Sequence, residues 1–321
     1  MKKPETLGGG MPQEAIGERP RDVLAEREGG IEVPETAELE SGREEKDQAE
    51  QERVEALREQ VKRESTPRKP KEGISEYIQK YVPEHLQKPD VLARTISGLA
   101  GVAGEMLLRF QGRKIEGREH VPTDGPYILV ANHTRDSDPV VTAAIAGRRV
   151  DYASTDMNFQ INPALSWFFK KLGLYSVKSS LGNISTEEKA ALMERVPKYP
   201  GHQRPYYQSV IDRPMDVANI RQFARETAAL LARGEPVVIF PEGLWLFEGN
   251  KMREAYPGVE LVLREYKRLT GKDVPILPVA ISDKQVHIDE LMVLGDGEEI
   301  HTVMRAIAEH LPEEERGFYS E

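Results

Sequence analysis

The chain has 321 residues, of which 31% are charged and 39% belong to the apolar set. Its formal net charge of −10 argues against a dedicated nucleic-acid-binding protein, because an acidic chain offers no broad basic surface to phosphates. The absence of cysteine excludes disulfides, thiol nucleophiles and cysteine-ligated metal centres. No uninterrupted run of 18 apolar residues occurs and the N-terminus lacks the apolar core of a secretory signal, so we expect a protein without a transmembrane span.

Residues 1–72 are expected to form a disordered, charged tail. They contain no aromatic residue and are rich in Glu, Gln, Arg and Gly, so they cannot bury enough apolar surface to offset the entropy lost on ordering. Val54, Leu57 and Val61 have helical spacing, but they amount to barely one heptad. A stable coiled coil is therefore not expected in the tail.

Residues 73–115 are expected to form a separate helical segment. Apolar residues recur at helical spacing across 91–110, which predicts an amphipathic helix. Gly98, Gly101 and Gly104 share one stripe of it, and because glycine weakens a helix by up to about 1 kcal/mol, the stripe suggests that another element approaches closely. Two interpretations stay open: the helix packs on the main domain, or it lies on a membrane with nearby basic side chains against anionic lipid.

Residues 116–321 alternate between short apolar runs and helical patterns. The runs predict strands at 127–131, 150–153, 174–177, 236–240, 276–281 and 286–293. The patterns predict helices at 140–147, 162–172, 217–231, 256–269 and 298–311. This alternation indicates a single α/β domain with a largely parallel central sheet flanked by helices. The proline-rich stretch 181–215 is expected to be a long irregular excursion.

The strongest chemical signal is His133 followed five residues later by Asp138, in the sequence NHTRDSDP. The histidine ends an apolar strand and the aspartate starts a helix as its N-cap, and parallel sheets place their sites at such strand ends. A neutral imidazole can take the proton of an attacking hydroxyl, and a carboxylate on the other ring nitrogen fixes the tautomer. The spacing alone is weak, because His85 and Asp90 share it in a polar stretch with no strand before it. A structural histidine and a plain N-cap therefore stay open.

A second signal is Glu242, which follows the strand at 236–240 in the sequence FPEG. Because this is the carboxyl end of another buried strand, the glutamate is expected to face the same crevice as His133. It could hold a substrate hydroxyl or brace the loop. A plain turn, explained by proline and glycine alone, is the structural alternative.

Four blocks in this order resemble the glycerolipid acyltransferases typified by 1-acyl-sn-glycerol-3-phosphate acyltransferase. Residues 132–138 match the family's N-H-x4-D block, and 173–178 partly match its G-x-I-x-V-x-R-like block. Residues 240–243 match the first half of its F-P-E-G-T-R-S block, and 274–280 match its V-P-V-x-P-V-A-like block. The resemblance covers roughly residues 110–321, and four ordered blocks are far more specific than any one of them.

The resemblance implies an enzyme that moves a fatty acyl group from acyl-CoA or acyl-carrier protein to the free hydroxyl of a lysophospholipid. The first expected acceptor is 1-acylglycerol-3-phosphate, which would give phosphatidic acid. His133 is implied to be the general base and Asp138 to orient it, with no cofactor, metal or covalent enzyme intermediate. The implied partners are membrane lipid, the acyl donor and the lysophospholipid, and nucleic acid is not among them. The implied location is peripheral, on the cytoplasmic face of the cell membrane, with the 91–110 helix and the aromatic triplet 167–169 as contacts.

The chain departs from the family directly after Gly243, where Leu-Trp-Leu replaces Thr-Arg-Ser. The arginine that the resemblance would assign to phosphate binding is therefore missing. In the second block the family's arginine falls near Ser179, one position after a lysine. Three basic residues could replace the lost charge, although a lysine is a point charge rather than a bidentate fork. The expected substrate-binding residues are Asn132, Lys178, Glu242, Gly243, Lys251 and Arg253.

Three other functions stay open. The first is acyl transfer to a different lipid alcohol, and the second is a non-catalytic lipid-binding protein of the same fold, which the lost Thr-Arg-Ser mildly favours. The third is a metallohydrolase using His133, Asp136 and Asp138, which ranks low because no second histidine lies at ligand spacing. The sequence also lacks the G-x-S-x-G elbow of serine hydrolases and the phosphate loop of nucleotide hydrolases.

Overall fold

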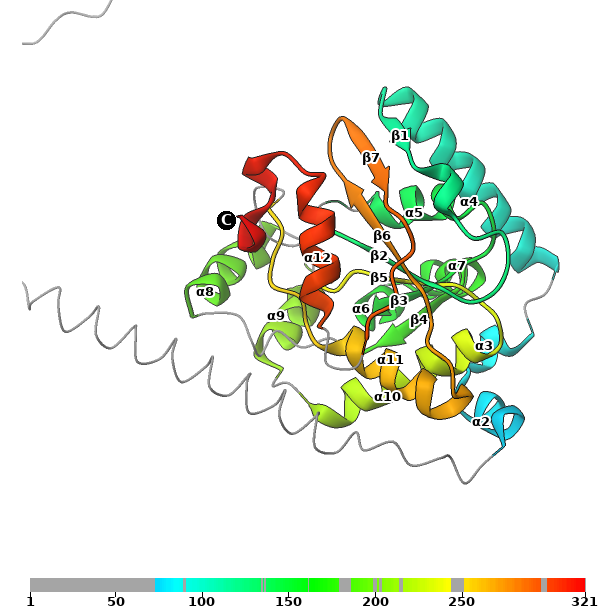
Figure 1. Cartoon of the computed structure of the whole chain (residues 1–321). Coiled ribbons are helices and arrows are strands. Elements are labelled where there is room, and N and C mark those ends of the chain that lie inside the picture. The colour runs from blue at the N-terminus through cyan, green and yellow to red at the C-terminus, as the bar shows by residue number, and fades with distance from the viewer. Residues whose placement is uncertain are drawn as a thin grey trace, which may run out of the picture. The chain divides into compact units, whose positions relative to one another are not determined.

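The computed structural model describes residues 73–321 except 89–90, 134, 136, 161, 179–185, 199–200, 202–203, 214–215, 244–250, 296–298 and 321. The tail expected at 1–72 lies outside the described residues. Within them, one seven-stranded sheet carries helices on both faces (Figure 1). This confirms the predicted α/β fold with a flanked central sheet.

The sheet has the strand order β1-β7-β6-β2-β5-β3-β4, and every neighbouring pair is parallel except β6 and β7. Strand β2 lies at the centre, between β5 and β6, and all four of its residues are buried. Burial on both faces explains why its sequence is a continuous apolar run rather than an alternating one. The strands are β1 (Lys114–Glu116), β2 (Ile128–Ala131), β3 (Asp151–Thr155), β4 (Leu174–Val177), β5 (Val237–Ile239), β6 (Ile276–Ile281) and β7 (Gln285–Ile288).

Helices cover the two faces unequally. Helices α2, α10, α11 and α12 bury their apolar sides on one face, while α4 and α5 cover the other. The helices are α2 (Ile74–Tyr81), α3 (Glu84–Gln87), α4 (Val91–Phe110), α5 (Asp138–Ala146), α6 (Met157–Gln160), α7 (Pro163–Leu172), α8 (Thr186–Arg195), α9 (Arg204–Asp212), α10 (Val217–Ala232), α11 (Gly258–Thr270) and α12 (Ile300–Glu309). Short 3-10 turns are η1 (Arg118–His120), η2 (Val196–Lys198), η3 (Glu313–Glu315) and η4 (Gly317–Tyr319).

The irregular excursion predicted at 181–215 is wrong for its described residues, which form α8, η2 and α9. The prolines do not interrupt these helices. Pro205 lies in the first turn of α9, where a missing backbone N–H breaks no helical hydrogen bond, and Pro197 lies in the 3-10 turn between the helices. Proline content therefore marks helix starts here rather than a loop.

Helix α4 covers all of the predicted segment 91–110 in one run. By length and composition it is the one helix among the described residues that could cross a membrane. The sequence shows no uninterrupted apolar run here because charged residues such as Glu105 interrupt the segment, and the expectation that nothing spans the bilayer stays a prediction. One side of α4 nevertheless packs on α5 and α7, with Leu108 buried.

The glycine stripe of α4 explains how closely α4 approaches α5. A Cβ added at Gly104 would lie 2.4 Å from the carbonyl oxygen of Val140 and 2.8 Å from Cβ of Ala144. At Gly101 the nearest atom would be 3.6 Å away, and at Gly98 nothing lies within 4 Å. The predicted close approach is confirmed at Gly104 alone, where any side chain would push the two helices apart.

Candidate active site

His133 and Asp138 meet at the carboxyl end of the central strand. Asp138 is fully buried, and its Oδ2 accepts hydrogen bonds from Nδ1 of His133 at 3.0 Å and from the backbone N–H of Arg135 at 2.7 Å. Because Nδ1 carries the proton in this bond, the other ring nitrogen, Nε2, is left as the proton acceptor. The imidazole is half-buried, and its side chain is 11% exposed.

The N-cap role predicted for Asp138 is wrong. Helix α5 begins at Asp138 itself, Ser137 occupies the cap position, and no side chain caps the helix. The carboxylate instead turns back toward the loop that precedes the helix, where it holds the imidazole. Of the rival pair, His85 bonds the carbonyl oxygen of Leu174 through Nε2 at 2.8 Å, and Asp90 lies outside the described residues.

Phe240 fixes the plane of the His133 ring. It follows β5, the strand next to β2, and its ring stacks on the imidazole with centroids 4.2 Å apart and planes inclined by 24°. One ring nitrogen is held by Asp138 and one ring face by Phe240. The imidazole therefore has little rotational freedom left to lose when a substrate arrives.

Glu242 lies one loop away on the same edge and holds the backbone of His133. Its Oε1 accepts the N–H of His133 at 3.0 Å, and its Oε2 accepts the N–H of Arg253 at 2.8 Å. Only 1% of Glu242 is exposed, and this burial raises its pKa to about 7 against the opposing effect of the two N–H donors. Of the alternatives left open by the sequence, the geometry favours bracing of the loop.

Asn132 locks the same loop from the other side. Its Nδ2 donates to the carbonyl oxygen of Ile281 at 2.9 Å, and its Oδ1 accepts the N–H of Ile281 at 2.7 Å. The side chain thus joins the end of β2 to the end of β6. The expectation that Asn132 and Glu242 bind substrate is not supported, because both are buried and both spend their polar atoms on the protein backbone.

Comparison with known proteins identifies the family of the chain. The family model described as Acyltransferase matches residues 112–282. The chain belongs to this family. It is therefore an acyltransferase, and the matched region contains His133, Asp138 and Glu242.

One solved structure is similar over much of its length. It is the 1-acyl-sn-glycerophosphate (LPA) acyltransferase PlsC from Thermotoga maritima, with a TM-score of 0.43 and 13% sequence identity. The match covers 72% of this chain and 84% of the other. No curated protein matches the chain.

The other expected site residues after β5 are Gly243, Lys251 and Arg253. Gly243 adopts φ +79°, and a Cβ there would lie 2.9 Å from the ring of Tyr256, so the turn has no room for a side chain at this position. Lys251 is exposed and Arg253 half-buried, both in the segment whose backbone Glu242 holds. Trp245 and the family's arginine position, Ser179, lie outside the described residues.

Lys178 is not brought to His133. It follows β4 at the edge of the sheet, and β5 and β3 lie between that strand and β2. Three strand spacings amount to roughly 14 Å. Lys178 instead lines a separate cavity of about 290 Å³ with residues of α10, among them Phe223 and Glu226.

Arg113 is a site residue that the sequence does not reveal. It is only 6% exposed, and its Nε and Nη1 have no hydrogen-bond partner among the residues that the structure describes. Burial lowers its pKa, as does the charge of Arg135, while the carboxylates of Asp138 and Asp283 oppose this shift. Arg113 is thus a buried cation that interacts electrostatically with Asp138, and two of its guanidinium nitrogens bond no residue that the structure describes.

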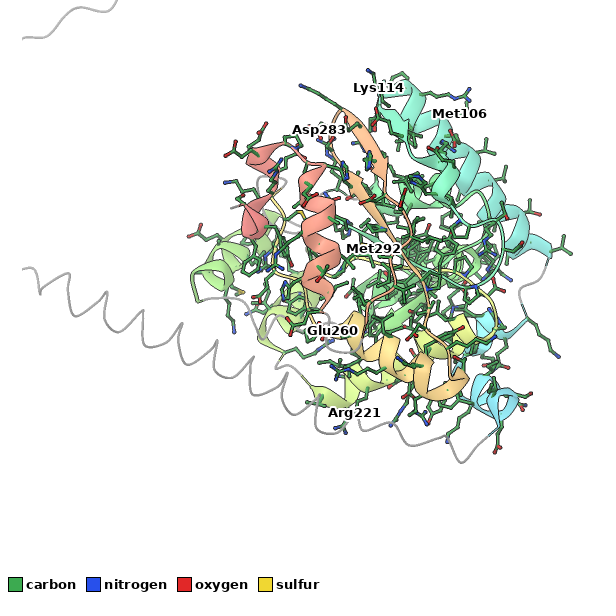
Figure 2. All side chains as sticks on the ribbon, viewed as in Figure 1. Met106, Lys114, Arg221, Glu260, Asp283 and Met292 are labelled. Atoms are coloured by element: carbon green, nitrogen blue, oxygen red, sulfur yellow. The ribbon has the colours of Figure 1, made fainter. Side chains whose placement is uncertain are left out.

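Strand pairing explains why no motif marks Arg113. The residue precedes the short strand β1, and β1 pairs with β7 far along the chain. The N–H of Lys114 bonds the carbonyl oxygen of Lys284 at 3.1 Å, which places this end of β1 at the turn that carries Asp283 (Figure 2). Asp283 in turn pairs with Arg135 of the loop between β2 and α5.

The raised pKa of Glu242 predicts a pH-dependent stability. Its pKa rises from about 4.5 to about 7 on folding, so its favourable contribution to folding is present below pH 4.5 and is lost as the pH rises through 7. Glutamine cannot ionise. The free energy of unfolding of the unmodified chain, relative to that of Glu242→Gln, should therefore fall by up to about 3 kcal/mol between pH 4.5 and 8.

Chemical denaturation of both proteins at stepped pH values measures this difference. Every other titrating group is shared by the two chains and cancels. A difference that stays flat, or grows with pH, would show that Glu242 is an ordinary ionised carboxylate in the folded protein.

Proposed function

We propose that this acyltransferase moves a fatty acyl group from acyl-CoA or acyl-carrier protein to the free hydroxyl of a lysophospholipid. The proposed acceptor is 1-acylglycerol-3-phosphate, and the product is phosphatidic acid. The observation that carries the proposal is the bond between the buried Asp138 carboxylate and Nδ1 of His133, in a loop held on both sides by Asn132 and Glu242.

The chemistry needs one base and no covalent enzyme intermediate. Nε2 of neutral His133 takes the proton of the acceptor hydroxyl while the hydroxyl oxygen attacks the thioester carbonyl. The tetrahedral intermediate collapses, the C–S bond breaks, and the leaving thiolate takes the proton back from the imidazolium. Asp138 stabilises the imidazolium between these two transfers, and backbone donors of the surrounding loops are the expected partners of the oxyanion.

We assign the acceptor's phosphate to Arg113. A buried guanidinium without acceptors is costly, and a phosphate would supply them through charge-assisted hydrogen bonds. Arg113 would take the part of the arginine that is missing after Gly243. Lys251 and Arg253 remain further candidates for the head group, while Lys178 is too far along the sheet edge to share it with them.

Catalysis by His133 predicts that His133→Ala lowers acyl transfer at least about 100-fold, because the acceptor hydroxyl loses its base. Asp138→Asn should also be strongly impaired, since the amide can hold the wrong tautomer. The assay offers labelled acyl-CoA, then acyl-carrier protein, to lysophosphatidic acid in liposomes. His85→Ala is the matched control, since that histidine has the same spacing to an aspartate.

The control should retain most of its activity. Full activity of His133→Ala would contradict the assignment of the base. No transfer by folded, unmodified protein with any donor and lysolipid would favour a non-catalytic lipid-binding protein, and transfer to other lysolipids alone would change the acceptor.

Phosphate binding by Arg113 predicts a selective change in Arg113→Ala. The KM for lysophosphatidic acid should rise about 10- to 100-fold, since a charge-assisted hydrogen bond contributes about 1.5–3 kcal/mol. Any transfer to monoacylglycerol, which has no phosphate, should be unchanged, and this serves as the test of folding. The neighbouring, exposed Lys114 gives the control variant Lys114→Ala. Equal effects of the two variants would remove Arg113 from the phosphate site.

Two helices present apolar side chains that suit a bilayer surface. On α4, Met106 (labelled in Figure 2) is 67% exposed and Phe110 92% exposed. On the adjoining α7, Trp167 is 51% exposed. Lys171 lies over the Trp167 ring and offers a positive charge to anionic lipid. Because α4 is docked on α5 through Gly104, we propose that it lies on the membrane rather than crossing it.

Peripheral binding through this surface predicts that Met106→Glu combined with Phe110→Glu lowers recovery on anionic liposomes in flotation. Phe318→Glu is the control, because Phe318 is 57% exposed on η4, which adjoins the helices of the opposite sheet face. Equal recovery of all three proteins would contradict the proposed surface. Resistance of the unmodified protein to an alkaline wash would indicate that α4 crosses the bilayer.

A further inference from the structure

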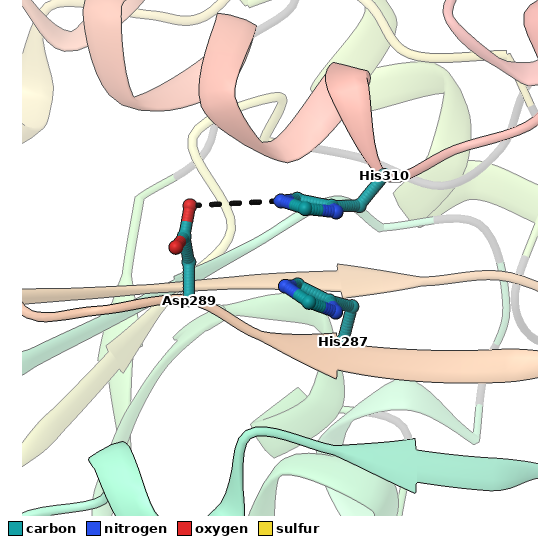
Figure 3. Close-up of side chains that lie close together, drawn as sticks. All are labelled: His287, Asp289 and His310. Atoms are coloured by element: carbon teal, nitrogen blue, oxygen red, sulfur yellow. Dashed lines mark ion pairs between the residues drawn. The ribbon is translucent and has the colours of Figure 1, made fainter.

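Two histidines and an aspartate converge outside the active site, between β7 and the end of α12. His287 belongs to β7, Asp289 follows that strand, and His310 is the residue directly after α12. All three are half-buried, and one ligand atom from each lies within 4.8 Å of the others. Figure 3 shows the two imidazoles one above the other, each with its outer nitrogen directed toward the carboxylate of Asp289.

The sheet separates this cluster from α5. Val286 and Ile288 point toward the face that α4 and α5 cover, so His287, between them, points toward the face that α12 covers. The sequence gives no warning of the cluster, because His287 and His310 are far apart in the chain and share no ligand spacing. The packing of α12 on β6, the strand paired with β7, brings them together.

The geometry does not fit ordinary hydrogen bonding. Nε2 of His310 lies 3.7 Å from Oδ2 of Asp289, which is too long for a hydrogen bond. Neither imidazole makes a hydrogen bond within the described part of the chain, although each has two ring nitrogens to satisfy. Two ligands about 2.1 Å from a tetrahedral ion lie about 3.4 Å apart. The separation of His310 and Asp289 is close to this value, and the three ligand atoms together lie within 4.8 Å of one another.

A carboxylate also stands behind one of the rings. Nδ1 of His287 lies 3.6 Å from Oε2 of Glu116 on β1, the strand paired with β7. Histidines that bind metals through one nitrogen commonly give the other to a carboxylate, which orients the ring and raises its basicity. Glu116 lies on the Nδ1 side of the ring, slightly beyond hydrogen-bond distance, and Nε2 of His287 remains for the ion.

We propose that His287, Asp289 and His310 bind a divalent transition-metal ion, with Zn²⁺ the best match to the ligand set. Two imidazoles and one carboxylate suit zinc, with solvent at a fourth position, while Mg²⁺ and Ca²⁺ favour sites built of oxygen. The site lies apart from His133, and its ion takes no part in the acyl transfer proposed above.

The ion would tie the end of α12 to β7 and so steady the segment that follows. The segment after α12 bonds the backbone of Met252, which lies next to the residue that Glu242 holds. The N–H of Met252 bonds the carbonyl oxygen of Glu315 at 2.8 Å, and the N–H of Phe318 bonds the carbonyl oxygen of Met252 at 2.9 Å. The next residue, Arg253, donates its N–H to Glu242. Metal binding would therefore stabilise a part of the fold on which the active-site loop rests.

The test uses the full chain, without a histidine tag, stripped with a chelator and then titrated with ZnCl₂ by calorimetry. Bound metal is counted by elemental analysis after gel filtration. We expect one Zn²⁺ per chain, a rise in Tm on binding, and no such response to MgCl₂. His287→Ala and Asp289→Asn should lose stoichiometric binding, and Glu116→Gln should weaken it about 10- to 100-fold.

His120→Ala is the matched control, because the ring of His120 bonds the carbonyl oxygen of Ile288 and so contacts the same strand without joining the cluster. It should keep the site. Asp289→Asn preserves the side-chain shape, so its Tm without zinc reports whether the variant is folded. No zinc bound by the unmodified chain, or undiminished binding by both ligand variants, would overturn the proposal.

Discussion

The hydrogen bonds that Glu242 accepts from two backbone N–H groups are the constraint on which the site depends. A carboxylate that is 1% exposed is costly to bury unless it is paired with donors, and here the donors belong to His133 and Arg253. Removing either donor would leave the carboxylate short of a partner in a buried position. The loop after β2 and the segment after β5 are therefore held to each other, and His133 is held with them before any substrate binds.

The order of strands decides which sequence blocks can share this site. Because β5 and β6 flank β2 in parallel, the residues after these three strands emerge at one edge and meet there. At this edge, Asn132 after β2 bonds the backbone of Ile281 at the end of β6, and Glu242 after β5 bonds the backbone of His133. Strand β4 emerges at the same edge but at its far end, so the block that contains Lys178 belongs to another part of the surface.

The sequence is sufficient for the features that have local causes. The run at 128–131 is apolar because β2 is buried on both faces, and Asn162 and Asp216 start helices because their side chains accept the N–H groups of the first turn. The pair His133 and Asp138 is local as well, since five residues separate them. Arg113 and the cluster around His287 are invisible in the sequence, because they depend on β1 pairing with β7 and on α12 packing beside it. The prolines in 181–215 led to the wrong prediction of an irregular segment. Their effect depends on whether each one falls inside a helix or at its start, which the sequence does not show.

The proposed membrane surface and the proposed base, His133, are connected through the contact that Gly104 makes. Gly104 lets α4 lie against the backbone of α5, and α5 begins with Asp138, the residue that holds His133. A side chain at Gly104 would displace α4 and its exposed apolar side chains from α5, the helix that begins with Asp138. If α4 lies on a membrane as proposed, this close contact would set the distance between the lipid surface and Nε2 of His133. An acceptor whose acyl chain stays in the bilayer would then have to present its hydroxyl at a fixed height, and the absence of a Cβ at Gly104 would contribute to the choice of substrate.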